Sequence, residues 1–179
     1  MIIISLFINE VNFKTNRQNI IDGWKRETFI YSKIGLIVCM VAVIAIMNLL
    51  AGFIMSNVVG VTLSADALKM VGFSFVQAMV YLLFALLLAT FFRRSGVAII
   101  VFFIYGLLLE FLFMWIAGKI SPGLQHFMPL QVADSLTPFP RLRDFYIGLP
   151  SETVMLLAAM AFGGLYAFLT VRKYKYDDL

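Results

Sequence analysis

Long uncharged runs of apolar residues dominate the hydrophobic pattern of this chain. A helix needs about 20 apolar residues to cross a bilayer, and four stretches meet that requirement with a single charged side chain among them, Glu110. These predicted spans are Ile34–Ile54, Val71–Phe92, Val97–Ala117 and Thr153–Val171. The link between the second and third spans is so short that these two must form an antiparallel hairpin. The pattern therefore predicts an all-α, polytopic helical membrane protein with one transmembrane domain over residues 1–179.

Composition supports the same fold class. Hydrophobic residues make up 62% of the chain and charged residues only 13%, against about 45–50% and about 25% in soluble domains. This excludes a soluble globular enzyme, a disulfide-stapled secreted module and a disordered chain. The net charge of +4 is not gathered into a basic stripe, so we expect the lipid bilayer, and not nucleic acid, as the partner of these charges.

The first eight residues are intensely apolar but too short to span. No basic residue precedes Met1–Ile8 and no small-residue cleavage site follows it, so the segment does not match a signal peptide. We expect it to be a partial span, the end of a longer transmembrane helix whose beginning is absent from this chain. A natural stub lying in the membrane interface is the alternative.

Basic residues are distributed unequally between the two sides of the predicted bundle. Ten of the 14 Lys and Arg residues fall in Asn9–Lys33, in the Arg93–Gly96 link and after Val171, all on one side. Connections rich in Lys and Arg remain in the cytoplasm. The count therefore predicts a cytoplasmic C-terminus and a cytoplasmic Asn9–Lys33 segment.

The Asn9–Lys33 segment has an amphipathic pattern. Ile20, Ile21 and Trp24 fall on one side at helical spacing, and Asp22–Gly23 interrupts the run, which predicts a helix, a bend and a second helix entering the membrane. One interpretation is a basic juxtamembrane loop held on anionic headgroups. The other is a docking helix that transmits force from a cytoplasmic partner.

The Gly118–Pro150 connection is long, contains all five prolines and is still rather apolar. We expect two short half-helices that re-enter the membrane from the outer face, since neighbouring spans can shield their polar backbone. An interfacial loop anchored by Phe127 and Tyr146 is equally consistent with the pattern. His126 has no further ligand type at metal-binding spacing, so we expect no metal.

Glu110 is an acid within a predicted span and should face the bundle interior or a wet cavity, because a charge in mid-bilayer is costly. Gly106 lies one turn earlier on the same face and permits close helix approach. Glu110 is therefore either a pathway residue or conformational latch, or a hydrogen-bonded structural acid.

Small residues recur every four positions in the last span, at Ala159, Gly163 and Ala167. Such a stripe lets helix backbones approach closely in lipid. Packing within one subunit is the more frequent meaning, and dimerisation is the alternative.

Motifs for nucleotide binding or catalysis are absent from the sequence. There is no G-x-x-x-x-G-K-[ST], G-x-S-x-G or H-E-x-x-H, so we expect no nucleotide, metal or other cofactor on this chain and no enzyme activity.

The segment NRQNIIDGWKRETFIYSK, followed at once by a span, resembles the cytoplasmic coupling segment of ABC-2-type transporter permeases. The pattern R-Q-x-x-x-x-G-x-x-R-x-x-x-x-x-x-K places its fixed positions at Arg17, Gln18, Gly23, Arg26 and Lys33. Members of that family have six spans, a coupling helix between the second and third, and a re-entrant outer segment between the fifth and sixth. The resemblance implies that this chain lacks the first span and most of the second.

The resemblance implies that the chain is the permease subunit of an ATP-driven exporter in the bacterial cytoplasmic membrane. The partners would be a separate ABC ATPase subunit and a second permease subunit, identical or different. The implied docking residues are Arg17, Gln18, Ile21, Asp22, Trp24 and Arg26. A small non-transporting membrane protein with an assembly or regulatory role is the alternative, and a membrane-embedded enzyme using Glu110 and His126 is a third.

Overall fold

The computed structural model describes residues 1–13, 15, 18, 21, 23, 25–60, 62, 64–121, 123–137 and 150–176, with only the backbone of residue 26. All regular structure in these residues is helical. Four helices are long and apolar enough to cross a membrane, which confirms the predicted fold class. The protein is therefore a multi-pass helical membrane protein.

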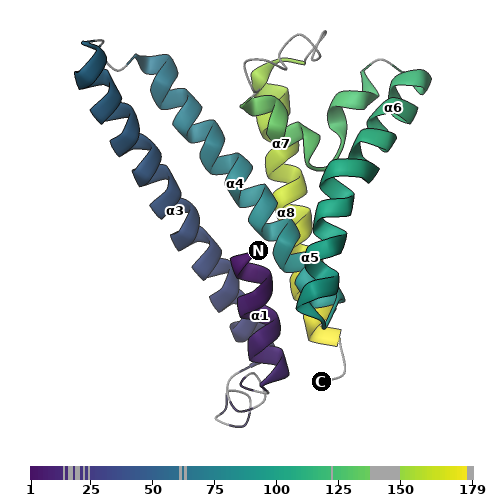
Figure 1. The fold of residues 1–179 in the computed structure, drawn as a ribbon. Coiled ribbons are helices and arrows are strands. Elements are labelled where there is room, and N and C mark those ends of the chain that lie inside the picture. The colour runs from purple at the N-terminus through teal and green to yellow at the C-terminus, as the bar shows by residue number, and fades with distance from the viewer. Residues whose placement is uncertain are drawn as a thin grey trace.

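The helices follow one another up and down the bundle (Figure 1). The long ones are α3, α4, the continuous α5–η1–α6 unit and α8, and the short ones are α1, η2 and α7. Their bounds are α1 Ile2–Asn12, α3 Arg26–Val59, α4 Ala65–Phe91, α5 Ser95–Ile104, η1 Tyr105–Leu109, α6 Glu110–Ile120, η2 Leu124–Phe127, α7 Gln131–Leu136 and α8 Glu152–Tyr176.

The helices continue beyond the apolar runs that predicted them. α3 has 34 residues, about 50 Å at 1.5 Å per residue, whereas the hydrocarbon core is about 30 Å thick. α3 ends only at Gly60, whose φ of 74° is a left-handed terminating conformation. α3 thus begins before and ends after the predicted span Ile34–Ile54, because hydropathy marks the membrane and caps mark the helix ends.

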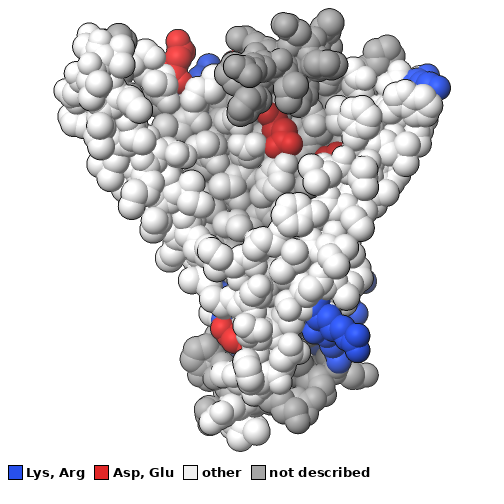
Figure 2. Space-filling model, in the orientation of Figure 1, with Lys and Arg blue, Asp and Glu red and all other residues white. Residues whose placement is uncertain are grey.

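The bundle has a narrow end and a wide end (Figure 1). The C-terminal end of α1, the start of α3, the α4–α5 link and the end of α8 lie together at the narrow end, and the α3–α4 and α6–α7–α8 arms diverge toward the wide end. The largest group of basic side chains in Figure 2 lies on one flank of the narrow part of the bundle. The three connections that were predicted to share one side of the membrane therefore reach the same end of the bundle.

The core is formed around α4, which contacts α1, α3, α5, α7 and α8. α1 contributes four buried apolar side chains, of which Ile3, Ile4 and Ile8 are fully buried. The predicted partial span Met1–Ile8 is thus part of a helix packed inside the bundle, and that helix continues to Asn12. Large apolar side chains on the outer faces of α3 and α6 remain exposed, as expected where lipid is the solvent.

Candidate functional site

The short helix α7, which follows α6 and η2, lies folded back into the bundle at the wide end. α7 packs against both α4 and α8, and Val132 and Ala133 on it are fully buried. The sequence left open whether this region dips inward or lies flat as an interfacial loop. In the described part, α7 lies among the long helices, while Tyr146, the predicted interfacial anchor, lies outside the described residues.

A buried carboxylate holds the start of α7. Glu110 is 4% exposed, and its Oε1 accepts hydrogen bonds from the backbone N–H groups of Leu130 and Gln131, both at 2.6 Å. The first N–H groups of a helix have no partner within the helix, and a carboxylate there also complements the helix dipole. Glu110 thus joins α6 to α7 by capping it.

A π-helical turn precedes this glutamate. In η1 the N–H of Glu110 donates to the carbonyl of Tyr105, five residues earlier. Such turns insert one residue into a helix and often occur at functional sites. The insertion changes which face of the helix carries Glu110 and so aligns it with α7.

A second carboxylate attaches α7 to α4. Asp134 accepts a hydrogen bond from Gln77 Nε2 at 2.8 Å and from the Tyr81 hydroxyl at 2.9 and 2.8 Å to its two oxygens. Thr137 Oγ1 donates a further hydrogen bond to Gln77 Oε1. Burial raises the pKa of the Asp134 carboxyl, although the bonds from Gln77 and Tyr81 act in the opposite direction. We call Glu110, Asp134, Gln77, Tyr81 and Thr137 the α7 site.

Sequence reasoning selected Glu110 and missed the other side of this site. The signal for it was present, because Gln77 and Tyr81 are four residues apart and share one face of a helix. Asp134 lies in the Gly118–Pro150 connection, for which the sequence predicted only short half-helices. Figure 2 shows acidic side chains within the hollow between the two arms.

Three buried polar atoms near this region have no hydrogen-bond partner among the described residues: His126 Nδ1, Gln131 Nε2 and the Tyr166 hydroxyl. Within the same described ranges, no three His, Cys, Asp or Glu side chains gather as a metal would require. His126 is 2% exposed, and its Nε2 lies 3.2 Å from Gln125 Nε2. The hydrogen bonds of Glu110 and Asp134 hold α7 between α6 and α4.

The narrow end is held by aromatic rings. Phe7 of α1, Phe29 of α3 and Tyr174 of α8 meet with centroid separations of 5.5 to 6.1 Å, and we call them the basal aromatic cluster. All three are at most 5% exposed. The cluster fixes the two helices that flank the predicted coupling segment to the end of α8.

Ion pairs reinforce the same three helices. Lys33 Nζ lies 2.6 Å from a carboxylate oxygen of Glu10, which joins α3 to α1. Lys175 Nζ lies 2.6 Å from Glu27 Oε1, which joins α8 to α3. Lys33 is the last position of the R-Q-x-x-x-x-G-x-x-R-x-x-x-x-x-x-K pattern. It therefore stabilises the contact between α1 and α3, the two helices on either side of the predicted coupling segment.

The predicted docking residues are only partly described. Arg17, Asp22 and Trp24 lie outside the described residues. Gln18 is exposed, Ile21 is 83% exposed, and Arg26 begins α3. Gly23 has a φ of 97°, a left-handed conformation that suits the bend predicted there.

The small-residue stripe of α8 faces other helices of the same chain. Ala159 is fully buried, and a methyl group added at Gly163 would lie 3.7 Å from both Leu83 and Val80 of α4. Ala159, Gly163 and Ala167 also line an apolar groove of about 330 Å³ between α3, α4 and α8. At Gly106, an added methyl would lie 4.0 Å from Leu130. At both glycines, an added methyl group would therefore make an ordinary van der Waals contact with the neighbouring helix.

The model of one protein family matches residues 1–137, which include α1 through α7. The chain belongs to the DUF2705 family. That family is described as a protein of unknown function. The DUF2705 match contains both carboxylates of the α7 site and the whole predicted coupling segment. No curated protein and no solved structure matches the chain.

Proposed function

We propose that this DUF2705 protein is the membrane-spanning permease subunit of an ATP-driven exporter of the ABC-2 type. Its place would be the bacterial cytoplasmic membrane, with the narrow end and the C-terminus in the cytoplasm. A separate ABC ATPase subunit would hydrolyse ATP, and a second permease subunit, identical or different, would complete the transporter. The export reaction would need no cofactor and no catalytic residue on this chain.

The connection of the coupling segment to the bundle carries the proposal. A segment that receives force must be attached to the helices that it moves. The basal aromatic cluster joins both flanking helices, α1 and α3, to α8, and the two ion pairs join α3 to α1 and α3 to α8. A displacement of the segment would therefore tilt these helices together as a rigid body.

The wide end supports the same proposal. The two arms diverge there (Figure 1), and α7 is attached to α6 through Glu110 and to α4 through Asp134. A tilt that begins at the narrow end would change the separation of α4 and α6, so α7 is placed to respond. Glu110 then acts as the latch that holds α7 in one state.

The test is whether an ABC ATPase co-purifies with the full chain from the membranes of its native cells. The variant Arg17→Glu/Arg26→Glu should release the ATPase while the spans remain inserted. The control Lys69→Glu/Lys119→Glu makes the same charge change at the wide end and should retain it. If the first variant keeps the ATPase, or if no ATPase co-purifies with the unaltered protein, the exporter assignment fails and a non-transporting membrane role gains support.

Orientation can be tested with cysteine labelling, because Cys39 is the sole cysteine of the sequence. In a Cys39→Ala background, a membrane-impermeant thiol reagent added to intact cells should label Thr62→Cys, an exposed position just after α3 at the wide end, and leave Ile21→Cys unlabelled. Labelling of Ile21→Cys instead would invert the topology and remove the basis of the exporter proposal.

A further inference from the structure

Three polar side chains lie on one face of α4. Within residues 70–89, the only side chains that carry a nitrogen or oxygen atom are those of Ser74, Gln77 and Tyr81. Their spacing of i, i+3 and i+7 places them on the same face of the helix. All three are half-buried, so this face is neither enclosed in the core nor fully open. We call these residues the polar face of α4.

Polar groups of neighbouring helices meet this face. Asn48 of α3 is exposed and donates a hydrogen bond from Nδ2 to Ser74 Oγ at 3.3 Å. A carboxamide can donate and accept further hydrogen bonds, whereas the described residues give Asn48 this one alone. On the other arm, Asp134 of α7 is bound by Gln77 and Tyr81. The polar face therefore borders the hollow between the two arms, in which Figure 2 shows acidic side chains.

These groups lie inside the membrane span and not at its edge. Lys69 pairs with Glu152 at 2.8 Å, and the exposure of both side chains marks the level of water at the wide end. At 1.5 Å per residue, Ser74 lies about 8 Å and Tyr81 about 18 Å further along α4, and the hydrocarbon core is about 30 Å thick. Polar side chains at such a depth face the bundle interior or a water-filled cavity.

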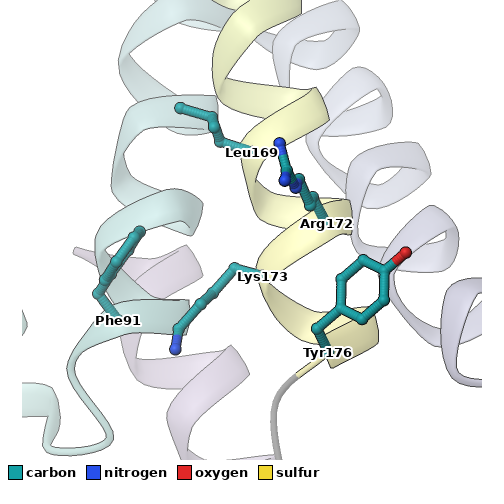
Figure 3. A pocket seen from close by; sticks show the side chains of 5 residues that line it. All are labelled: Phe91, Leu169, Arg172, Lys173 and Tyr176. Carbon is teal, nitrogen blue, oxygen red and sulfur yellow. The ribbon is translucent and has the colours of Figure 1, made fainter.

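Charged side chains at the narrow end are placed differently. A hollow of about 420 Å³ there is lined by Phe91 of α4 and by residues of the last turns of α8 (Figure 3). Its cations, Arg172 and Lys173, come directly after the apolar run that ends at Val171, where long basic side chains reach the membrane interface. The polar face of α4 lies away from such a boundary, so water has to enter the bundle to reach it.

Buried polar atoms near Glu110 also favour water inside the bundle. The Tyr166 hydroxyl and Gln131 Nε2 have no hydrogen-bond partner among the described residues, and these residues are only 5% and 6% exposed. Gln131 donates its backbone N–H to Glu110. The ring of Tyr166 packs on Phe84, as does that of Tyr105, which begins the π-helical turn before Glu110. Buried polar groups in proteins are bonded to protein atoms or to ordered water.

We propose that Asn48 and the polar face of α4 line a water-filled vestibule that opens at the wide end and admits water and small hydrophilic solutes as far as Asp134 of α7. A few water molecules beyond it would bond to Tyr166 and Gln131. The vestibule depends on groups of the wide end alone, so it holds whether or not an ATPase drives this protein.

The experiment measures how fast single cysteines react with a charged methanethiosulfonate reagent. The full chain with Cys39→Ala is reconstituted in phosphatidylcholine vesicles with the reagent on both sides, so the result does not depend on orientation. Ser74→Cys places a thiol on the polar face. Gly72→Cys is the matched control, because position 72 is about 3 Å away along α4 and turned by about 200°. A side chain added there meets no atom within 4 Å.

The reacting species is the thiolate, which apolar surroundings disfavour. Each unit by which they raise the thiol pKa lowers the thiolate fraction about ten-fold. Ser74→Cys should therefore react at least about ten-fold faster than Gly72→Cys, although position 72 is the more exposed of the two. Thr137→Cys should react as well, because Thr137 is half-buried and bonds to Gln77 from the α7 side.

Three results would overturn the proposal. Slow reaction of both Ser74→Cys and Gly72→Cys would mean that lipid or another helix covers the polar face. Equally fast reaction of both would mean that water surrounds α4 at this depth. An unreactive Thr137→Cys would contradict the extension of the vestibule to α7. Unfolding midpoints equal to that of Cys39→Ala establish that the variants are folded, and the reaction needs no ATPase, so its outcome is separate from the co-purification test.

Discussion

At the narrow end of the bundle, three aromatic rings and two ion pairs join α1, α3 and α8, whereas at the wide end two carboxylates hold the six-residue α7 between α6 and α4. The first arrangement spreads cohesion over a large contact surface. The second depends on a few hydrogen bonds whose backbone donors have no alternative partner in lipid. The two ends should therefore respond differently to the loss of single groups.

The difference also suggests a division of labour for the proposed exporter. A firmly packed narrow end moves as one body, and a lightly attached α7 can exchange between two arrangements. Elements that move in functional transitions are drawn from the less stable parts of a protein. Substitutions at the two ends should therefore differ in how strongly they lower stability and in whether they expose α7.

The largest effect is expected for Phe29→Ala at the narrow end. Phe29 is 2% exposed and contacts both other rings of the basal aromatic cluster, so its removal leaves a cavity between three helices. We expect the free energy of unfolding to fall by about 3 kcal/mol, measured by thermal unfolding in detergent. Phe53→Ala is the matched control, because Phe53 lies on the same helix and is 59% exposed. If both substitutions lowered the free energy of unfolding equally, the buried ring would contribute no more to stability than an exposed ring on the same helix.

The next effect is expected for Glu110→Ala at the wide end. This variant leaves the buried N–H groups of Leu130 and Gln131 without their acceptor, at a cost of about 2 kcal/mol. Glu110→Gln retains an acceptor oxygen and should lose clearly less. Hydrogen exchange at the start of α7 should rise in the Ala variant while the narrow end keeps its protection. Unchanged exchange there would contradict the capping role of Glu110.

The sequence predicted the four spans because an apolar run of 20 residues is a local property of the chain. It did not predict where the helices end, since α3 continues to the left-handed Gly60 and α1 continues through Glu10 to Asn12. Nothing in a hydropathy pattern marks those positions.

The α7 site could be predicted only in part, because its residues meet through contacts between distant segments of the chain. Glu110 was selected because a lone acid in a span must find a partner, but the partner turned out to be the backbone of a segment 20 residues away. Asp134 and Gln77 are 57 positions apart, and their pairing follows from how α7 folds back. No local pattern specifies that register.

A pH dependence is expected from Asp134. Burial raises the pKa of this carboxyl above its ordinary value of 3.8 in the folded protein, so the folded state holds the proton more tightly than the unfolded chain. Stability contributed by this group is therefore present at acid pH and is lost as the pH rises through the folded pKa. Asp134→Asn should flatten the dependence of the unfolding midpoint on pH. A steeper dependence in the Asn variant would contradict the sign.

The smallest effects are expected for the ion pairs of the narrow end, and the two pairs should differ. Lys33 and Glu10 have side chains only 11% and 29% exposed, whereas Lys175 and Glu27 are 50% and 38% exposed. Water and salt screen the more exposed pair, and such pairs contribute little. Lys33→Gln should lower the free energy of unfolding by about 1 kcal/mol, while Lys175→Gln should leave the unfolding midpoint unchanged. If Lys175→Gln lowered the free energy of unfolding more than Lys33→Gln, the narrow end would be held together by exposed charges and not by its buried contacts.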